Sequence, residues 1–79
     1  MDKTEFLKLC QKVAVLPKPQ NALPDLFVKY NGISYLPVGY KLTFDKGGNA
    51  INTAILRDLN QSNSIINCDL SKIERMCNE

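Results

Sequence analysis

The spacing of apolar residues changes near Leu26, and this change is the strongest constraint on the fold of this 79-residue chain. Before Leu26, apolar residues recur every three or four positions, which is the period of an amphipathic helix. After it, they alternate with polar residues, as in half-buried strands. The sequence therefore predicts an α+β fold, in which an N-terminal amphipathic helix packs on a small antiparallel sheet of four to five strands.

The predicted helix spans residues 3–16. Its apolar stripe consists of Phe6, Leu9, Cys10, Val13 and Leu16. Asp2 and Glu5 have the spacing of a capping box at the first turn. Pro17 ends the helix, because the residue before a proline avoids the helical region. The next segment, residues 17–25, is rich in proline and predicts an extended connector without regular hydrogen bonds, which Leu23 would attach to the core.

Turn residues divide residues 26–76, the predicted β region, into antiparallel strands. Asn31-Gly32 is typical of a tight hairpin turn, because both positions accept positive φ. The strand that follows this turn carries an alternating apolar pattern as far as Phe44. A bulge or bend near Pro37 is expected there, because the parity of the apolar residues reverses at that point.

Further strands are predicted at about residues 50–59 and 64–70. Residues 71–76 are ambiguous, because Ser71 and Glu74 suit a capped helical turn whereas the apolar residues suit a closing strand. A single turn followed by a short strand is preferred. This order of elements favours an SH3-like barrel over an open meander.

The length and composition are typical of one ordinary globular unit. With 44% hydrophobic and 23% charged residues, the chain is expected to fold as a single domain over residues 1–79. Homodimerisation is left open, because a core of this size gives modest stability. No apolar run approaches the roughly 18 residues of a membrane span, and no secretory signal is visible. The cysteines, Cys10, Cys68 and Cys77, are odd in number, so we expect free thiols and a cytoplasmic location.

Catalytic and metal-binding patterns are missing from the sequence. The chain has no histidine, and its carboxylates are scattered without a paired arrangement. Three cysteines without close pairing do not form a structural zinc site. Gly47-Gly48 lacks the Lys-Ser/Thr of a phosphate-binding loop and predicts a glycine turn. We expect no enzymatic activity, no catalytic residue, no metal and no cofactor.

Protein–protein interaction is the preferred function on sequence grounds, with single-stranded or duplex nucleic-acid binding as the alternative. Five residues are candidates for partner contact, because aromatic and arginine side chains are enriched at binding hot spots and lysines beside aromatics suit nucleic acid. They are Phe27, Lys29, Tyr35, Lys41 and Arg57. Of the aromatics, Phe27 and Tyr35 are expected to be exposed, whereas Tyr30 and Tyr40 are expected to line the core.

Two further observations concern context. A net charge of +2, from 10 basic and 8 acidic residues, is small for a protein that must neutralise phosphates. Abundant asparagine and lysine are typical of an AT-rich coding genome. Together with the absence of catalytic patterns, they favour an accessory protein of a phage or other mobile element, for instance an inhibitor of a host enzyme.

Leu7 and Val15, on the flanks of the helix, are apolar beyond what one buried face requires.

Overall fold

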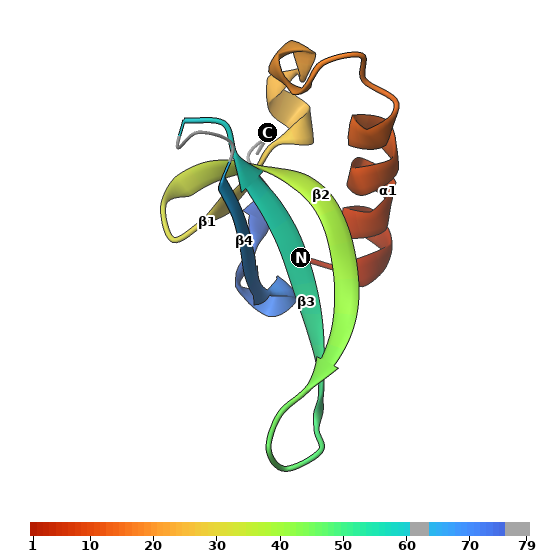
Figure 1. Ribbon diagram of the computed structural model, residues 1–79, viewed down its shortest axis with the longest axis vertical. Helices are drawn as coiled ribbons and strands as arrows, with labels where there is room; N and C mark the ends of the chain where they lie inside the picture. Colours follow the sequence, from red (N-terminus) through yellow and green to blue (C-terminus); the bar gives the residue numbers. More distant parts are fainter. Residues whose placement is uncertain (61–63, 76–79) are drawn as a thin grey trace.

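The computed structural model describes residues 1–60 and 64–75 and contains one α-helix and five strands (Figure 1). In chain order the elements are α1 (Lys3–Ala14), the 3-10 turns η1 (Pro19–Asn21) and η2 (Pro24–Leu26), β1 (Val28–Tyr30), β2 (Ile33–Phe44), β3 (Ala50–Asp58), β4 (Ser64–Asp69), the 3-10 turn η3 (Leu70–Lys72) and β5 (Glu74–Arg75). No helix within the described residues is long and apolar enough to cross a membrane.

Helix α1 begins where the sequence predicts. The Asp2 carboxylate accepts a hydrogen bond from the Glu5 amide at 3.3 Å, which satisfies one of the free N–H groups of the first turn. The Glu5 side chain instead forms an ion pair with Arg75 of β5 and so connects the helix to the edge of the sheet. The helix ends at Ala14, two residues before the predicted end.

All five strands form one antiparallel sheet in the order β4-β3-β2-β1-β5. The predicted hairpin turn joins β1 to β2, with φ of 56° at Asn31 and 80° at Gly32. Both values lie in the left-handed region that Asn-Gly tolerates best. The expectation of a helix on an antiparallel sheet of four to five strands is therefore confirmed.

Strand β2 is long and bent, and it pairs with β1 through residues 33–35 and with β3 through residues 36–44. The pairing register with β3 shifts between Pro37 and Gly39, which is the bulge expected from the reversal of apolar parity. The closed SH3-like barrel is not confirmed, because within the described residues β4 and β5 remain the two open edges of the sheet. A bent, open sheet is the observed architecture.

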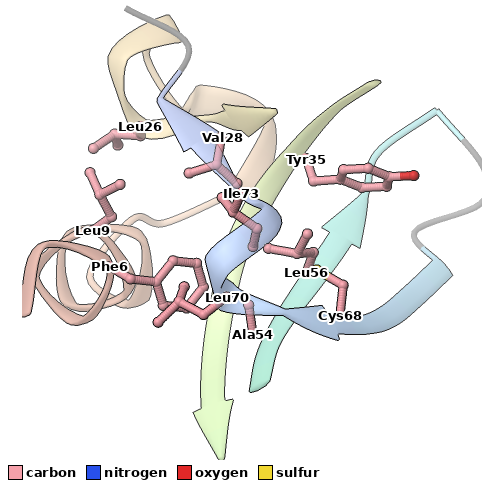
Figure 2. Packing of buried hydrophobic residues seen from close by; sticks show 10 residues of the cluster. All are labelled: Phe6, Leu9, Leu26, Val28, Tyr35, Ala54, Leu56, Cys68, Leu70 and Ile73. Carbon is pink, nitrogen blue, oxygen red and sulfur yellow. The ribbon is translucent and has the colours of Figure 1, made fainter. Parts of the chain in front are cut away.

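The core lies between α1, the bent sheet and η3 (Figure 2). In Figure 2, Phe6 of α1 lies beside Leu70, and Leu9 points toward Leu26. The buried apolar cluster consists of Phe6, Leu9, Leu26, Val28, Tyr35, Ala54, Leu56, Cys68, Leu70 and Ile73. Cys10, Val13 and Leu16 are partly buried against it, so the predicted apolar stripe of the helix is confirmed.

The connector differs from its prediction. It contains η1 and η2, each with a proline in its first turn, where the missing N–H of proline costs nothing. Leu23 is 65% exposed and does not attach the connector to the core. Leu26 does so instead, because it is buried in the apolar cluster.

The end of the described chain contains the preferred turn and short strand, η3 and β5. Asp69 caps the turn by accepting hydrogen bonds from the amide and hydroxyl of Ser71, both at 2.9 Å, so the cap is Asp69 and not Ser71 as predicted. The Met1 amino group donates to the carbonyl oxygens of Leu70 at 3.3 Å and Ile73 at 3.0 Å. These bonds hold the start of α1 against η3.

Candidate functional site

The β2–β3 hairpin projects beyond the N-terminal end of α1, along the longest dimension of the molecule (Figure 1). Strand β2 has 12 residues, which extend to about 40 Å. Helix α1 also has 12 residues, but these extend to only about 18 Å. The helix therefore covers only part of the strand, and the end of the hairpin has no helix packed on it.

The hairpin tip is fixed by Asp45. Its carboxylate accepts hydrogen bonds from the Gly47 and Asn49 amides at 2.9 Å and from Asn49 Nδ2 at 3.2 Å. Gly48 supplies the positive φ of 83° that the turn requires. The hydrogen bonds from Asn49 have the largest effect in lowering the pKa of Asp45, and those from the glycine amides lower it further. Because the tip is ordered by its own carboxylate, the apolar side chains beside it have a defined position.

One face of the hairpin is apolar and continuous with the core. Tyr40 is opposite the buried Ala54, and Tyr40 itself packs against the core. Alternation along β2 places Leu42 and Phe44 on the same face. Leu42 is 52% exposed and Phe44 is 64% exposed. We call Tyr40, Leu42 and Phe44 the hairpin apolar face.

The inner end of this face is held by polar contacts. The Tyr40 hydroxyl donates to Asn52 Oδ1 on β3, and Lys3 Nζ lies 5.1 Å from the centroid of the Tyr40 ring. The ammonium group covers a ring face in the geometry of a cation–π interaction. Tyr40 is therefore a fixed support, whereas Leu42 and Phe44 remain accessible.

Two lysines border the hairpin apolar face. Lys3 lies at its inner end and Lys46 lies in the tip loop, whereas Lys41 alternates with Tyr40 and Leu42 and therefore lies on the opposite face of the strand. None of the three forms an ion pair with another residue in the described ranges. The carboxylate of Asp45 is already engaged with its own loop. The unpaired charge around the face is therefore positive.

The structure separates the five residues predicted to contact a partner. Phe27 is half-buried beside Pro24, and Lys29 and Lys41 are exposed on β1 and β2. Arg57 is half-buried on β3, at the end of the strand away from the hairpin tip. The exposure expected for Tyr35 is wrong, because it is only 8% exposed and belongs to the core. The five residues do not form one patch.

The reason for the error at Tyr35 is the bulge in β2. Just before the bulge β2 is buried on both faces, because Tyr35, Leu36 and Pro37 are all buried, whereas after it even-numbered residues such as Tyr40 face the core. The prediction assumed that even-numbered residues face the core along the whole strand, and this assumption placed Tyr35 on the exposed face. Tyr30 and Tyr40, which were expected to line the core, are partly buried against it.

Leu42 and Phe44 were not selected from the sequence, although a signal for them was present. The apolar alternation of β2 is longer than a helix of the predicted length covers, so its last members had to remain without a helix. The predicted strand is longer than the predicted helix, and comparing the two lengths identifies Leu42 and Phe44 as residues that the helix does not cover.

The environment of the thiols in the described residues disfavours their thiolate form. Cys10 and Cys68 are free, and burial raises the pKa of Cys10 to about 11. Burial is also the main cause that raises the pKa of Cys68, and the negative charge of Asp69 adds to it. Within residues 1–60 and 64–75, no group of three His, Cys, Asp or Glu side chains is placed to hold a metal ion. Cys77 lies outside the described residues.

Comparisons of the chain with models of protein families, with curated proteins and with solved structures find no match in any of the three. The chemistry of the chain's own residues therefore carries the functional proposal.

Proposed function

We propose that this chain is a binding protein that acts without catalysis, by inserting the hairpin apolar face into a protein partner. The observation that carries the proposal is the exposure of Leu42 and Phe44, 52% and 64%, on a hairpin whose tip is internally ordered. Aromatic and aliphatic side chains on a rigid projection lose little conformational entropy on binding. They suit the anchors of a small interface.

The surroundings of the face define the partner's chemistry. The positive charges of Lys3 and Lys46 complement a partner whose apolar hollow is rimmed by carboxylates. Such charges accelerate association and select the partner, while the apolar anchors supply most of the affinity.

Nucleic acid is the less favoured partner. Base stacking requires exposed aromatic faces, but Tyr35 is buried and Lys3 covers a face of the Tyr40 ring. Phe44 alone of these aromatics is mostly exposed, at 64%. A net charge of +2 also supplies few phosphate contacts.

Three finer expectations belong to the same proposal. The strand order, the bent β2 and the turn η3 support a relation to SH3-like architectures. The free thiols of Cys10 and Cys68 support a reducing compartment, the cytoplasm. The Asn- and Lys-rich composition supports an accessory protein of a phage or mobile element that inhibits a host enzyme by occupying its surface.

The test is affinity capture with matched variants. The protein carries a C-terminal tag, because the Met1 amino group is bonded to Leu70 and Ile73. Extract of the native host is treated with nuclease, and bound proteins are identified by mass spectrometry. Wild type is compared with a Leu42→Ser/Phe44→Ser double variant and with Ile65→Ser as the control. Ile65 is 51% exposed, but alternation places it on the opposite face of the sheet.

The proposal predicts one stoichiometric protein that wild type and Ile65→Ser retain and the double variant loses. Binding that disappears on nuclease treatment would instead identify nucleic acid as the partner. A protein retained equally by all three variants would show that the hairpin apolar face is not its binding site.

A further inference from the structure

A small pocket lies at the opposite end of β3 from the hairpin tip, between the second half of α1 and the β2–β3 pair. Its volume is about 190 Å³. Six of its lining residues have uncharged side chains: Cys10, Val13, Ala14, Pro19, Leu36 and Val38. The remaining lining residue is Arg57 of β3, whose guanidinium is the single positive charge in the wall.

Arg57 has unused hydrogen-bonding capacity in this pocket. Its Nε atom is buried and has no hydrogen-bond partner. Within the described ranges, Arg57 also forms no ion pair. A buried N–H without an acceptor is unfavourable, and native structures contain few of them. A carboxylate in the pocket would pair with this otherwise unpaired guanidinium, and a small shift of the Arg57 side chain would bring the buried Nε–H to the same acceptor.

The neighbouring groups favour an external anion. Burial raises the pKa of Cys10 to about 11, so the thiol in the wall stays neutral near pH 7 and does not neutralise Arg57. The planar fork of a guanidinium matches the two oxygens of a carboxylate. Apart from Arg57, the side chains that line the pocket offer no donor stronger than the Cys10 thiol to the further oxygens of a phosphate or sulfate, so a carboxylate attached to an apolar group is the better match.

The volume limits the size of that group. Pockets for drug-sized ligands measure about 300–1,000 Å³, whereas an engineered apolar cavity of about 150 Å³ holds one benzene molecule. A pocket of about 190 Å³ therefore suits one side-chain-sized group. We infer that this pocket binds a carboxylate that bears a short branched or aromatic apolar group, with Arg57 contacting the carboxylate and α1 and β2 enclosing the apolar part.

This site is separate from the hairpin apolar face. Arg57 pairs with Leu36, whereas the hairpin ends at the pairing of Phe44 with Ala50. Arg57 lies seven positions after Ala50 in β3, which corresponds to about 23 Å of extended strand. The pocket and the hairpin can therefore be tested by independent variants.

The experiment is a titration of the isotope-labelled full chain with isovalerate, followed by amide NMR. Isovaleramide, the neutral isostere, is the ligand control. Two peptides distinguish the source of the carboxylate: a short peptide that ends in leucine with a free carboxylate, and the same peptide with an amidated end. The proposal predicts saturable shifts at Cys10, Val13 and Arg57 with isovalerate, with the free-acid peptide, or with both, and none with the amides.

Variants then test the assigned residues. Arg57→Gln should weaken binding by more than about tenfold, because it removes a charge-assisted hydrogen bond. Ala14→Leu should also abolish binding by filling the pocket while it retains Arg57; Ala14 is exposed at the end of α1, so this variant is expected to fold. The Leu42→Ser/Phe44→Ser variant should bind isovalerate as wild type does, which separates this proposal from the hairpin proposal.

Three results would overturn the inference. These are the absence of saturable shifts with both the acid and the free-acid peptide, equal binding of the amides, and unchanged binding by a folded Arg57→Gln or Ala14→Leu variant.

Discussion

At the hairpin tip, the charge of one residue organises a loop. The Asp45 carboxylate binds two backbone amides and one side-chain amide of its own loop, and these bonds lower its pKa. Because the folded pKa lies below the ordinary value of 3.8, this contribution to stability is present above the unfolded pKa. It is lost as the pH falls through the folded pKa.

Acid titration of the loop tests this effect. The amide NMR signals of Gly47 and Asn49 should titrate together with a midpoint below 3.8, because both amides donate to Asp45. An Asp45→Asn variant should lose that titration. A midpoint at or above 3.8 in wild type would contradict the assigned role.

A second residue-scale prediction concerns Cys10. With a pKa of about 11 in place of 9.0, its thiol holds roughly 100-fold less thiolate at neutral pH. The greater nucleophilicity of a high-pKa thiolate offsets part of this loss. In a Cys68→Ser/Cys77→Ser background, alkylation by iodoacetamide at pH 7.5 should therefore be at least about tenfold slower than in the same protein unfolded in urea. Equal rates would show that Cys10 is not shielded.

Among the elements, the turn between β1 and β2 depends on one backbone conformation. Gly32 has φ of 80°, which strains an L-residue, although a Cβ there would meet no neighbouring atom. Gly32→Ala should thus lower the free energy of unfolding by about 1 kcal/mol in urea denaturation. Gly47→Ala is the control, because Gly47 lacks positive φ and its Cβ would make contacts of 3.4 Å or longer. A similar loss in both variants would contradict the conformational explanation.

The two ends of the β2–β3 pair should respond differently to truncation. Leu56 is fully buried, so Leu56→Ala should cost about 2–5 kcal/mol of unfolding free energy. Leu42→Ala should change it by less than about 0.5–1 kcal/mol, because Leu42 is 52% exposed. Urea denaturation of both variants measures the difference. A large loss at Leu42 would mean that the hairpin apolar face serves the fold.

Elements with local signals could be predicted from the sequence. The capped helix, the Asn-Gly hairpin and the bulge near Pro37 each depend on neighbouring residues and were found. The connector was not, because Pro19 and Pro24 begin 3-10 turns as readily as they interrupt helices. The position of Tyr35 depends on whether odd- or even-numbered residues of β2 face the core on each side of the bulge. Tertiary packing decides this.

The candidate sites were harder to predict than the elements. Arg57 was selected by residue type, but its pocket forms only when α1 lies beside β2 and β3. Leu42 and Phe44 were predicted to lie in an alternating strand, but no prediction was made of whether a helix covers the end of that strand. Their exposure follows from the unequal lengths of a strand and a helix with the same number of residues.

At the scale of the whole molecule, the fold separates a packed body from a projecting hairpin. The core, α1 and η3 occupy one part, and the hairpin extends along the 40 Å axis (Figure 1). This arrangement places the exposed Leu42 and Phe44 at one end of the molecule, which is the end that the partner contacts in the proposed function. The body then acts as the support that holds the hairpin in place.

Site-specific photo-crosslinking tests this account most directly. A photoreactive phenylalanine analogue replaces Phe44, and a second protein carries it at position 65 on the opposite face of the sheet. Both are irradiated in nuclease-treated extract of the native host. The account predicts one discrete protein adduct from position 44 and none of that mass from position 65. Adducts that are absent at position 44, or equal at both positions, would contradict the proposal that the hairpin apolar face binds the partner.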